Sequence, residues 1–231
     1  MIANCRGGIG TQLIELMGWY ALAIEARDTI DLININCGGW RDDGAGNVLK
    51  DYISELFVMP KARVRTTSGT AKLGIFQKPG IFDLILKHRK DIRAQLGPMK
   101  FYFPAPLVPV LHVRRGDYQW VPIETYIEYA RKNVPVCFIG NIADDTADVA
   151  RESGYTAAAD ISNTATIDWL AAFFAPEVIG TASTFIISML FMDPTKHVKM
   201  FRNQEGAVFE DCMRPLLRQF EPQFPNFRWA E

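Results

Sequence analysis

Short apolar runs alternate with helix-like segments from residue 107 to residue 201, and this alternation constrains the fold more than any other feature. The runs have the length of buried strands, and the segments between them carry apolar residues at helical spacing. Strands are predicted at 107–113, 134–140, 155–159, 177–181 and 197–201, and helices at 122–132, 143–153, 164–174 and 183–192. Because strands that alternate with helices form parallel sheets, this half predicts an α/β fold with helices on both sheet faces.

The first hundred residues predict a second, less regular α/β unit. We expect strands at 2–5 and 28–35, helices at 11–27, 48–57 and 81–96, and a hairpin or mobile loop over 60–80. Four prolines between residues 98 and 109 surround Phe101-Tyr102-Phe103, a pattern that is typical of a domain crossing. We therefore predict an N-terminal domain over 1–104 and a C-terminal domain over 105–231, with the tail 220–229 packing across a neighbouring domain.

Composition excludes some classes of function. Of the 231 residues, 48% are hydrophobic and 22% charged, and the net charge is −1, as in ordinary globular proteins. A nucleic-acid-binding protein would carry a basic excess, so no nucleic-acid partner is expected, and the basic run 87–90 is interpreted as a solvated helix face. The sequence lacks a secretory signal and any window of the ~18 apolar residues that a membrane span needs, so we expect a cytoplasmic protein.

The cysteines and the paired aspartates give no sign of a disulfide framework or a metal centre. The four cysteines are widely spread, and Cys5 and Cys137 fall in predicted strands, so buried free thiols in a reducing compartment are expected. The pairs Asp42-Asp43 and Asp144-Asp145 are interpreted as turn formers and helix-start charges. No metal ligands and no resident cofactor are predicted.

An arginine pair follows the predicted strand 107–113, in the run His112-Val113-Arg114-Arg115-Gly116-Asp117-Tyr118. The guanidinium group is a planar, permanent cation that binds phosphate through paired hydrogen bonds, and ligands of α/β proteins lie at strand ends. The glycine after the pair allows a ligand to approach closely. The run therefore predicts an anion site, and specifically a diphosphate site. A surface salt bridge to Asp117 or Glu124, and an ordinary buried role for His112, are the alternatives.

Two other strand-to-helix junctions carry groups that suit phosphate. Gly7, Gly8 and Gly10 stand before and at the start of the first helix, where backbone N–H groups would meet the positive helix end. This run lacks the spacing of a dinucleotide fingerprint and the lysine of a P-loop, and a tight structural turn explains it equally well. Ser183 and Thr184 follow the strand at 177–181, where they can cap the next helix and also bind phosphate.

Together the three junctions resemble the motifs of bacterial alpha-1,2-fucosyltransferases. The run from Gly7 to Leu13 is similar to the GG-L-GNQ-L opening of that family, and His112 to Tyr118 matches its HxRRGD[Y/F] motif in full. Residues 168–185 are similar to a third block, in which an aspartate, a helix, a strand and an N-S-[ST]-F segment follow in order. The resemblance covers most of the chain, with its blocks in the right sequence.

The resemblance implies a fold and an activity. The fold is of the GT-B type, in which two Rossmann-like domains face a cleft and the C-terminal domain holds a parallel sheet. The activity is transfer of fucose from GDP-fucose to a sugar hydroxyl, with inversion and without an essential metal. The implied partners are a nucleotide sugar and a glycan acceptor, and no cofactor is implied beside the donor substrate.

The resemblance also implies roles for single residues. The implied donor-binding residues are Gly7, Gly8, Gly10, His112, Arg114, Arg115, Asp168, Ser183 and Thr184. Arg114 and Arg115 would bind the diphosphate, and Arg115 would be the more sensitive of the two. Fixed arginines stabilise the negative charge that develops on the departing GDP, so a cation can be dispensed with. Asp117 would shape the donor pocket and is a candidate base for the acceptor proton.

A few positions depart from the family pattern. Thr11 and Ala182 stand where the family has asparagines, Ile186-Ile187 replace an aromatic pair, and Gly140-Asn141 stand in place of a serine-aspartate segment. Two alternatives therefore stay open: a transferase that uses another GDP-sugar, and a non-catalytic domain that binds a GDP-sugar or a glycan.

Overall fold

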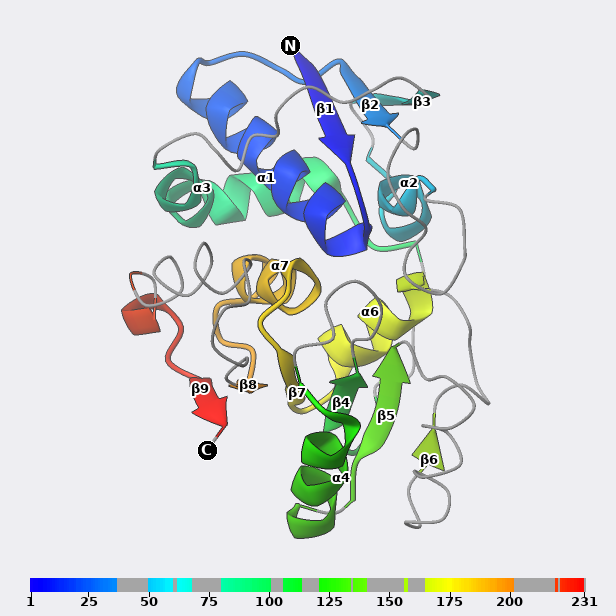
Figure 1. Cartoon of the computed structure of the whole chain (residues 1–231). Coiled ribbons are helices and arrows are strands. Elements are labelled where there is room, and N and C mark those ends of the chain that lie inside the picture. The colour runs from blue at the N-terminus through cyan, green and yellow to red at the C-terminus, as the bar shows by residue number, and fades with distance from the viewer. Residues whose placement is uncertain are drawn as a thin grey trace. The chain divides into compact units, whose positions relative to one another are not determined.

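The computed structural model (Figure 1) divides the chain into two compact units, Met1–Tyr102 and Phe103–Glu231. The structure describes residues 1–36, 50–59, 62–67, 80–100, 106–113, 121–133, 135–140, 156–157, 165–201, 219 and 221–230. Each unit is an α/β unit with its own parallel sheet, so the predicted α/β class is confirmed.

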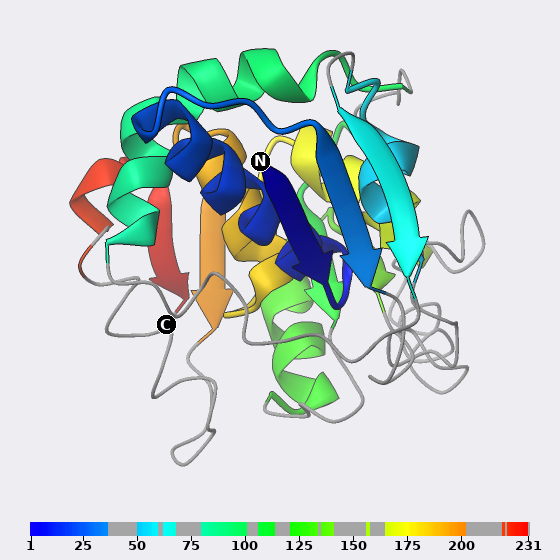
Figure 2. The same cartoon turned by 90° about the horizontal axis from the view of Figure 1, so that it is seen from above.

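The sheet of the first unit has three parallel strands in the order β1-β2-β3. The strands are β1 (Ile2–Arg6), β2 (Leu32–Asn36) and β3 (Arg63–Thr67), which lie side by side in Figure 2. The prediction of a hairpin or mobile loop over 60–80 is wrong for β3, which pairs with β2 in parallel. The strand predicted at 28–35 begins only at Leu32, because Asp28 and Asp31 use their carboxylates to bind the backbone and side chain of Thr29.

The core of the first unit lies between this sheet and its helices, α1 (Ile9–Glu25), α2 (Tyr52–Leu56) and α3 (Ile81–Leu96). Along β1 and β2 buried residues alternate with more exposed ones, so one face of the sheet carries the buried side chains of Ala3, Cys5, Ile33 and Ile35. Helix α1 packs on β1 and on α3. It is buried over most of its circumference, as expected of a helix that is apolar on nearly every side.

The second unit holds a six-stranded sheet in which every pair of neighbours is parallel. The strands are β4 (Val110–Val113), β5 (Cys137–Gly140), β6 (Thr156–Ala157), β7 (Val178–Thr181), β8 (Val198–Phe201) and β9 (Phe227–Ala230). Their order is β6-β5-β4-β7-β8-β9, so the chain starts in the middle, runs out to one edge and returns to build the other half. This is the doubly wound order of a Rossmann-like sheet, with its switch point between β4 and β7.

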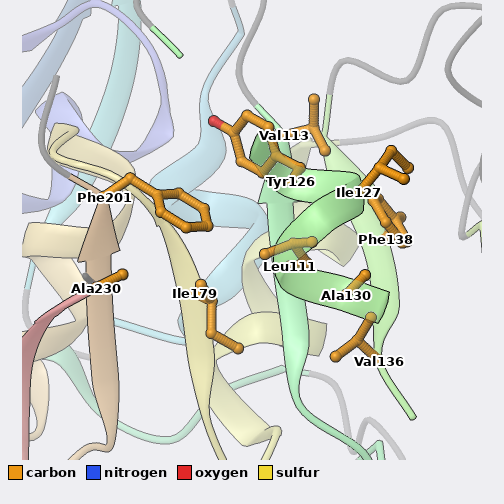
Figure 3. Packing of buried hydrophobic residues seen from close by; sticks show 10 residues of the cluster. All are labelled: Leu111, Val113, Tyr126, Ile127, Ala130, Val136, Phe138, Ile179, Phe201 and Ala230. Atoms are coloured by element: carbon orange, nitrogen blue, oxygen red, sulfur yellow. The ribbon is translucent and has the colours of Figure 1, made fainter. Parts of the chain in front are cut away.

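Helices cover both faces of the second sheet, as predicted. Helix α4 (Ile123–Lys132) places Tyr126, Ile127 and Ala130 over one face, in the cluster drawn in Figure 3. Helices α6 (Ala165–Phe174) and α7 (Thr184–Met192) cover the opposite face. On β4 the side chains of Leu111 and Val113 point to the α4 cluster, whereas His112 between them stacks on Phe185 of α7. Helix α6 contacts β4 and β5, and α7 contacts β7. The helix predicted at 143–153 lies outside the described residues.

The aromatic tail is part of the second unit's own sheet. A short 3-10 helix, Glu221–Gln223, leads into β9, which pairs with β8. Phe227 is buried, and the buried ring of Phe224 meets Phe191 of α7 edge-on with 5.7 Å between centroids. The prediction that this tail packs across a neighbouring domain is therefore wrong, because its aromatic residues complete the edge of the C-terminal core.

Two further expectations concern the cysteines and the membrane. Cys5 is a buried free thiol, as predicted, whereas the free thiol of Cys137 is only partly buried. Within the described ranges, no helix combines the length and the apolar character needed to cross a membrane.

Candidate functional site at the switch point

The carboxyl ends of β4 and β7 lie side by side at the switch point of the second sheet. In the register of these two strands His112 lies opposite Gly180, one residue before each strand ends. Ligands of doubly wound sheets bind outside the carboxyl ends of the strands at this point. Arg114, Arg115 and Asp117 follow β4 directly in the sequence, but they lie outside the described residues.

His112 is packed into the core on the side of α7. Its side chain is buried, and its ring stacks on that of Phe185, with centroids 4.2 Å apart and planes 4° from parallel. The backbone of Gly180 on β7 lies so close that an added Cβ would sit 2.8 Å from the His112 carbonyl oxygen. The ring of His112 is therefore buried, as one of the two interpretations of this residue predicted, and it packs on Phe185 of α7.

Asp168 binds the backbone of Gly140, where β5 ends beside β4. Asp168 lies in the first turn of α6, and its Oδ2 accepts a hydrogen bond of 3.2 Å from the backbone N of Gly140 at the end of β5. Gly140 has φ +101°, and a Cβ there would lie 3.1 Å from His112 Cδ2 and 2.3 Å from the Val113 carbonyl oxygen. Asp168 therefore fixes the end of β5, and the end of β4 lies so close to Gly140 that a side chain would not fit there. Burial, followed by the charge of Asp168, raises the pKa of the Cys137 thiol.

Ser183 and Thr184 lie at the junction between β7 and α7. Ser183 is fully buried and is the N-cap of α7, its Oγ accepting a hydrogen bond of 3.4 Å from the backbone N of Ile186. The predicted capping role is therefore confirmed for Ser183. Thr184 is the first residue of the helix. Ala182 is buried beside them, at the position where the related motif has an asparagine.

The glycine turn connects β1 to α1 in the first unit. Gly7 has φ +75°, and a Cβ on it would lie 3.3 Å from the side chain of Thr11, so both the conformation and the space favour glycine. Gly8 is the N-cap of α1. Helix α1 begins at Ile9 rather than at Thr11 as predicted, which places Gly10 inside its first turn.

Two buried polar residues lie beside this turn: Gln12, which belongs to the run from Gly7 to Leu13 but had no predicted role of its own, and Glu15, which was not singled out. Gln12 and Glu15 are both fully buried, one helical turn apart on α1. The Gln12 amide donates 2.8 Å hydrogen bonds to the carbonyl oxygens of Gly7 and Lys50 and accepts one of 3.2 Å from Tyr52 N. Polar residues three apart inside an apolar helix were the signal that could have identified them.

Glu15 binds the residue that precedes the turn. Its Oε2 accepts a 2.8 Å hydrogen bond from Arg6 N, and its Oε1 lies 3.4 Å from Arg6 Nε. Burial raises the pKa of Glu15 to about 7, although Arg6 acts in the opposite direction. Burial also raises the pKa of Cys5 well above its usual range, with Glu15 as the second cause.

The residues of the site thus form two described groups, one in each unit. The first is the glycine turn with its supports Arg6, Gln12 and Glu15, and the second is the switch-point group of His112, Gly140, Asp168 and Ser183. That both groups face one cleft stays a prediction. Among the residues that the structure places, no three His, Cys, Asp or Glu side chains come together in a way that could hold a metal ion. The pairs Asp42-Asp43 and Asp144-Asp145 lie outside those residues.

Comparison with known proteins gave structural neighbours only. No family model matches the chain, and no curated protein matches it. Among solved structures, it is similar to NodZ alpha-1,6-fucosyltransferase soaked with GDP-fucose, with a TM-score of 0.43, 14% identity, and coverage of 84% of this chain and 92% of that chain. It is also similar to the same enzyme co-crystallised with GDP, with a TM-score of 0.44, 13% identity, and coverage of 87% and 94%. The fucosyltransferase NodZ from Bradyrhizobium gives a TM-score of 0.43, 14% identity, and coverage of 84% and 93%. The overall likeness is partial, so the chain's own residues and strand order bear on its function.

Proposed function

We propose that this chain is a glycosyltransferase that moves fucose from GDP-fucose to a sugar hydroxyl, with inversion and without an essential metal ion. The observation that carries the proposal is the position of the HxRRGDY run. It begins within β4, and Arg114 follows the last residue of that strand at the switch point of a doubly wound sheet. Such a position is where a phosphate-bearing ligand binds in this type of sheet.

The second strand at the switch point supports the same ligand. Strand β7 ends at Thr181, and Ser183 and Thr184 then open α7. The Oγ of Ser183 accepts the capping hydrogen bond and the residue is fully buried, so the partly exposed Thr184 is the hydroxyl better placed to donate to a phosphate oxygen. A phosphate there would also be favoured by the N-terminal end of the helix.

Each predicted residue has a role in this proposal. Arg114 and Arg115 bind the diphosphate as planar cations. Asp168 shapes the pocket by binding Gly140 at the end of β5, and His112 shapes it by packing on Phe185 of α7. Gly7 and Gly8 are the further residues proposed to bind the donor.

The reaction is a displacement at the anomeric carbon of the donor. The acceptor oxygen forms a bond to C1 of fucose while the bond from C1 to the β-phosphate oxygen breaks, and the bonding electrons leave with GDP. Arg114 and Arg115 stabilise that growing negative charge. Asp117 is the proposed base that takes the proton of the acceptor hydroxyl.

Two alternatives are favoured by specific residues. Thr11 and Ala182 stand where the related motifs have asparagines, which favours either a different GDP-sugar donor or a domain that binds a GDP-sugar or glycan without turnover. Incubating the protein with GDP-fucose and, separately, with other GDP-sugars and a panel of galactosides, with and without a chelator, distinguishes them. Fucose transfer seen by mass spectrometry supports the proposal, GDP binding without hydrolysis or transfer supports the binding domain, and activity that chelation abolishes contradicts metal independence.

The diphosphate assignment is tested by Arg115→Ala. We expect GDP to bind about 10- to 100-fold more weakly, because hydrogen bonds to charged groups contribute about 1.5–3 kcal/mol. Arg115→Lys keeps the charge but loses the planar fork, so its affinity should be intermediate. Arg131→Ala, which removes an exposed arginine of α4, is the matched control. Calorimetric titration gives the affinities and circular dichroism checks the fold; unchanged affinity in Arg115→Ala would remove the assignment.

A further inference from the structure

The glycine turn is held by two buried polar side chains that an apolar helix would not otherwise contain. Gln12 and Glu15 have no exposed surface, and α1 around them is lined by residues such as Leu13, Leu16 and Met17. Burying a polar group costs free energy unless it is hydrogen-bonded. Both side chains direct their hydrogen bonds to the chain immediately around the turn and to the start of α2, so their role is to fix that backbone.

The two side chains fix consecutive residues. Glu15 binds Arg6 through both carboxylate oxygens, at 2.8 Å to the backbone N and 3.4 Å to Nε. Gln12 binds the carbonyl oxygen of the next residue, Gly7, at 2.8 Å. Gly7 has a backbone conformation, φ +75°, that side chains rarely adopt. The backbone at the end of β1 is therefore fixed by hydrogen bonds from two buried side chains of α1.

The charge of Glu15 is variable near neutral pH. Burial raises the pKa of its carboxyl to about 7, while Arg6 lowers it. The other titratable groups near it in the described elements are the Cys5 thiol on β1 and the Asp51 carboxylate before α2. The pKa of Cys5 is raised by burial first, then by the charge of Glu15 and then by that of Asp51. Hydrogen bonds to an ionised carboxylate are shorter and roughly twice as strong as neutral ones. Loss of the Glu15 proton therefore strengthens its hydrogen bonds to the backbone N and the Nε of Arg6.

We propose that Glu15 is a positioning residue for the turn at Gly7 and Gly8, and that its ionised form holds the turn in the conformation that binds GDP. The statement about the turn depends only on the contacts within the first unit. The statement about GDP rests on the proposed function, in which Gly7 and Gly8 are donor-binding residues.

The turn itself is observed through the backbone amide resonances of Gly7 and Gly8 in a pH titration. We expect both amides to shift with a midpoint near the pKa of Glu15, about 7. Glu15→Gln keeps the shape and should abolish that shift. Glu25→Gln removes an exposed carboxylate at the other end of the same helix, bound to Lys87 and His88, and should leave the shift in place. Amides that do not titrate in the native chain, or that titrate equally in Glu15→Gln, would overturn the proposal.

A second variant tests the same proposal without changing the buried residue Glu15 itself. Arg6→Met removes the cation that lowers the pKa of Glu15 and leaves residue 15 untouched. The midpoint of the Gly7 and Gly8 shifts should then move to higher pH. An unchanged midpoint in a folded Arg6→Met protein would show that the amides report on another group.

GDP affinity gives the functional half of the test. Between about pH 8 and about pH 6, binding to the native chain should weaken by roughly three- to tenfold more than binding to Glu15→Gln, as expected from the loss of one charge-assisted hydrogen bond. The comparison with the variant removes the titration of GDP's own terminal phosphate near pH 6, which both proteins experience. Equal pH profiles would overturn the link between Glu15 and the donor. Failure of the native chain to bind GDP at any pH would instead contradict the proposed function, while the amide titration still decides the role of Glu15.

Discussion

Gly140 ends β5 beside β4, and its substitution is expected to be severe. It has φ +101°, and the Cβ of an alanine would lie 2.3 Å from the carbonyl oxygen of Val113. That oxygen belongs to the backbone of the neighbouring strand and cannot rotate away as a side chain would. Gly140→Ala should therefore lower the free energy of unfolding by about 3 kcal/mol or more, measured by chemical denaturation.

Gly80 provides the matched control for this substitution. It also has a left-handed conformation, φ +72°, but nothing lies within 4 Å of an added Cβ. Gly80→Ala should cost only the conformational strain, about 1–2 kcal/mol. Equal losses in the two variants would show that backbone conformation, and not the contact with Val113, makes glycine necessary at residue 140.

Single residues also show which contacts sequence patterns can predict. Ser183 was predicted to cap a helix, and it does, because capping depends on neighbours only three residues away. The roles of Gln12 and Gly180 depend on partners far along the chain, Lys50 for the first and His112 for the second. Such contacts follow from tertiary packing, so local spacing could mark Gln12 as a polar residue in an apolar helix but could not identify the partners of either residue.

At the scale of elements, β9 makes the tail a structural part of the C-terminal sheet. Phe227 is 1% exposed and is paired with Val198 of β8. Phe227→Ala should cost about 3–5 kcal/mol of unfolding free energy, because it removes a large buried ring and leaves a cavity. Arg228→Ala, at the adjacent exposed position, removes hydrogen bonds to the carbonyl oxygens of Pro225 and Phe227 and should cost no more than about 1 kcal/mol. Thermal unfolding of the two variants checks this, and equal effects would contradict the assignment of the tail to the core.

The elements that sequence predicted well are those with a strong local period. The helix at 81–96 has the predicted bounds. The strands and helices from 164 to 201 each begin one residue later than predicted and end where predicted. Strand β4 begins at Val110 rather than at residue 107, because Leu107 is 95% exposed and precedes Pro109. Strands β3 and β9 were missed because their pairing partners, not their own composition, make them strands.

For the whole molecule, the site predicted from sequence rests on strand order as much as on motifs. A run of arginines after a strand indicates an anion site, but only the order β6-β5-β4-β7-β8-β9 places the end of β4 at a switch point. The sequence predicted a parallel sheet, and it could not predict this order, since pairing between distant strands leaves no periodic signal. The order and the arginine run together therefore support the donor site more strongly than either does alone.

The stability of the whole chain is expected to depend on pH through Glu15. Burial raises the pKa of this carboxyl from 4.5 to about 7, so between these values the folded chain keeps a proton that the unfolded chain has lost. The free energy of unfolding should therefore fall as the pH rises through this window, by up to about 3 kcal/mol at 1.36 kcal/mol per pKa unit. The exposed carboxylates Glu25 and Asp31 have lowered pKa values, and their stabilisation is lost only at lower pH.

Denaturant titrations of the native chain and of Glu15→Gln at pH values across this window measure the effect. The native chain should show the decline, and the variant should show a much flatter profile, because glutamine carries no proton to lose. A decline of the same size in the variant would assign it to another group. A decline that is confined to the native chain would mean that the ionised carboxylate which holds the Gly7 turn also destabilises the fold. The chain would then retain a costly buried charge beside a turn, which selection for stability alone would replace with an apolar residue.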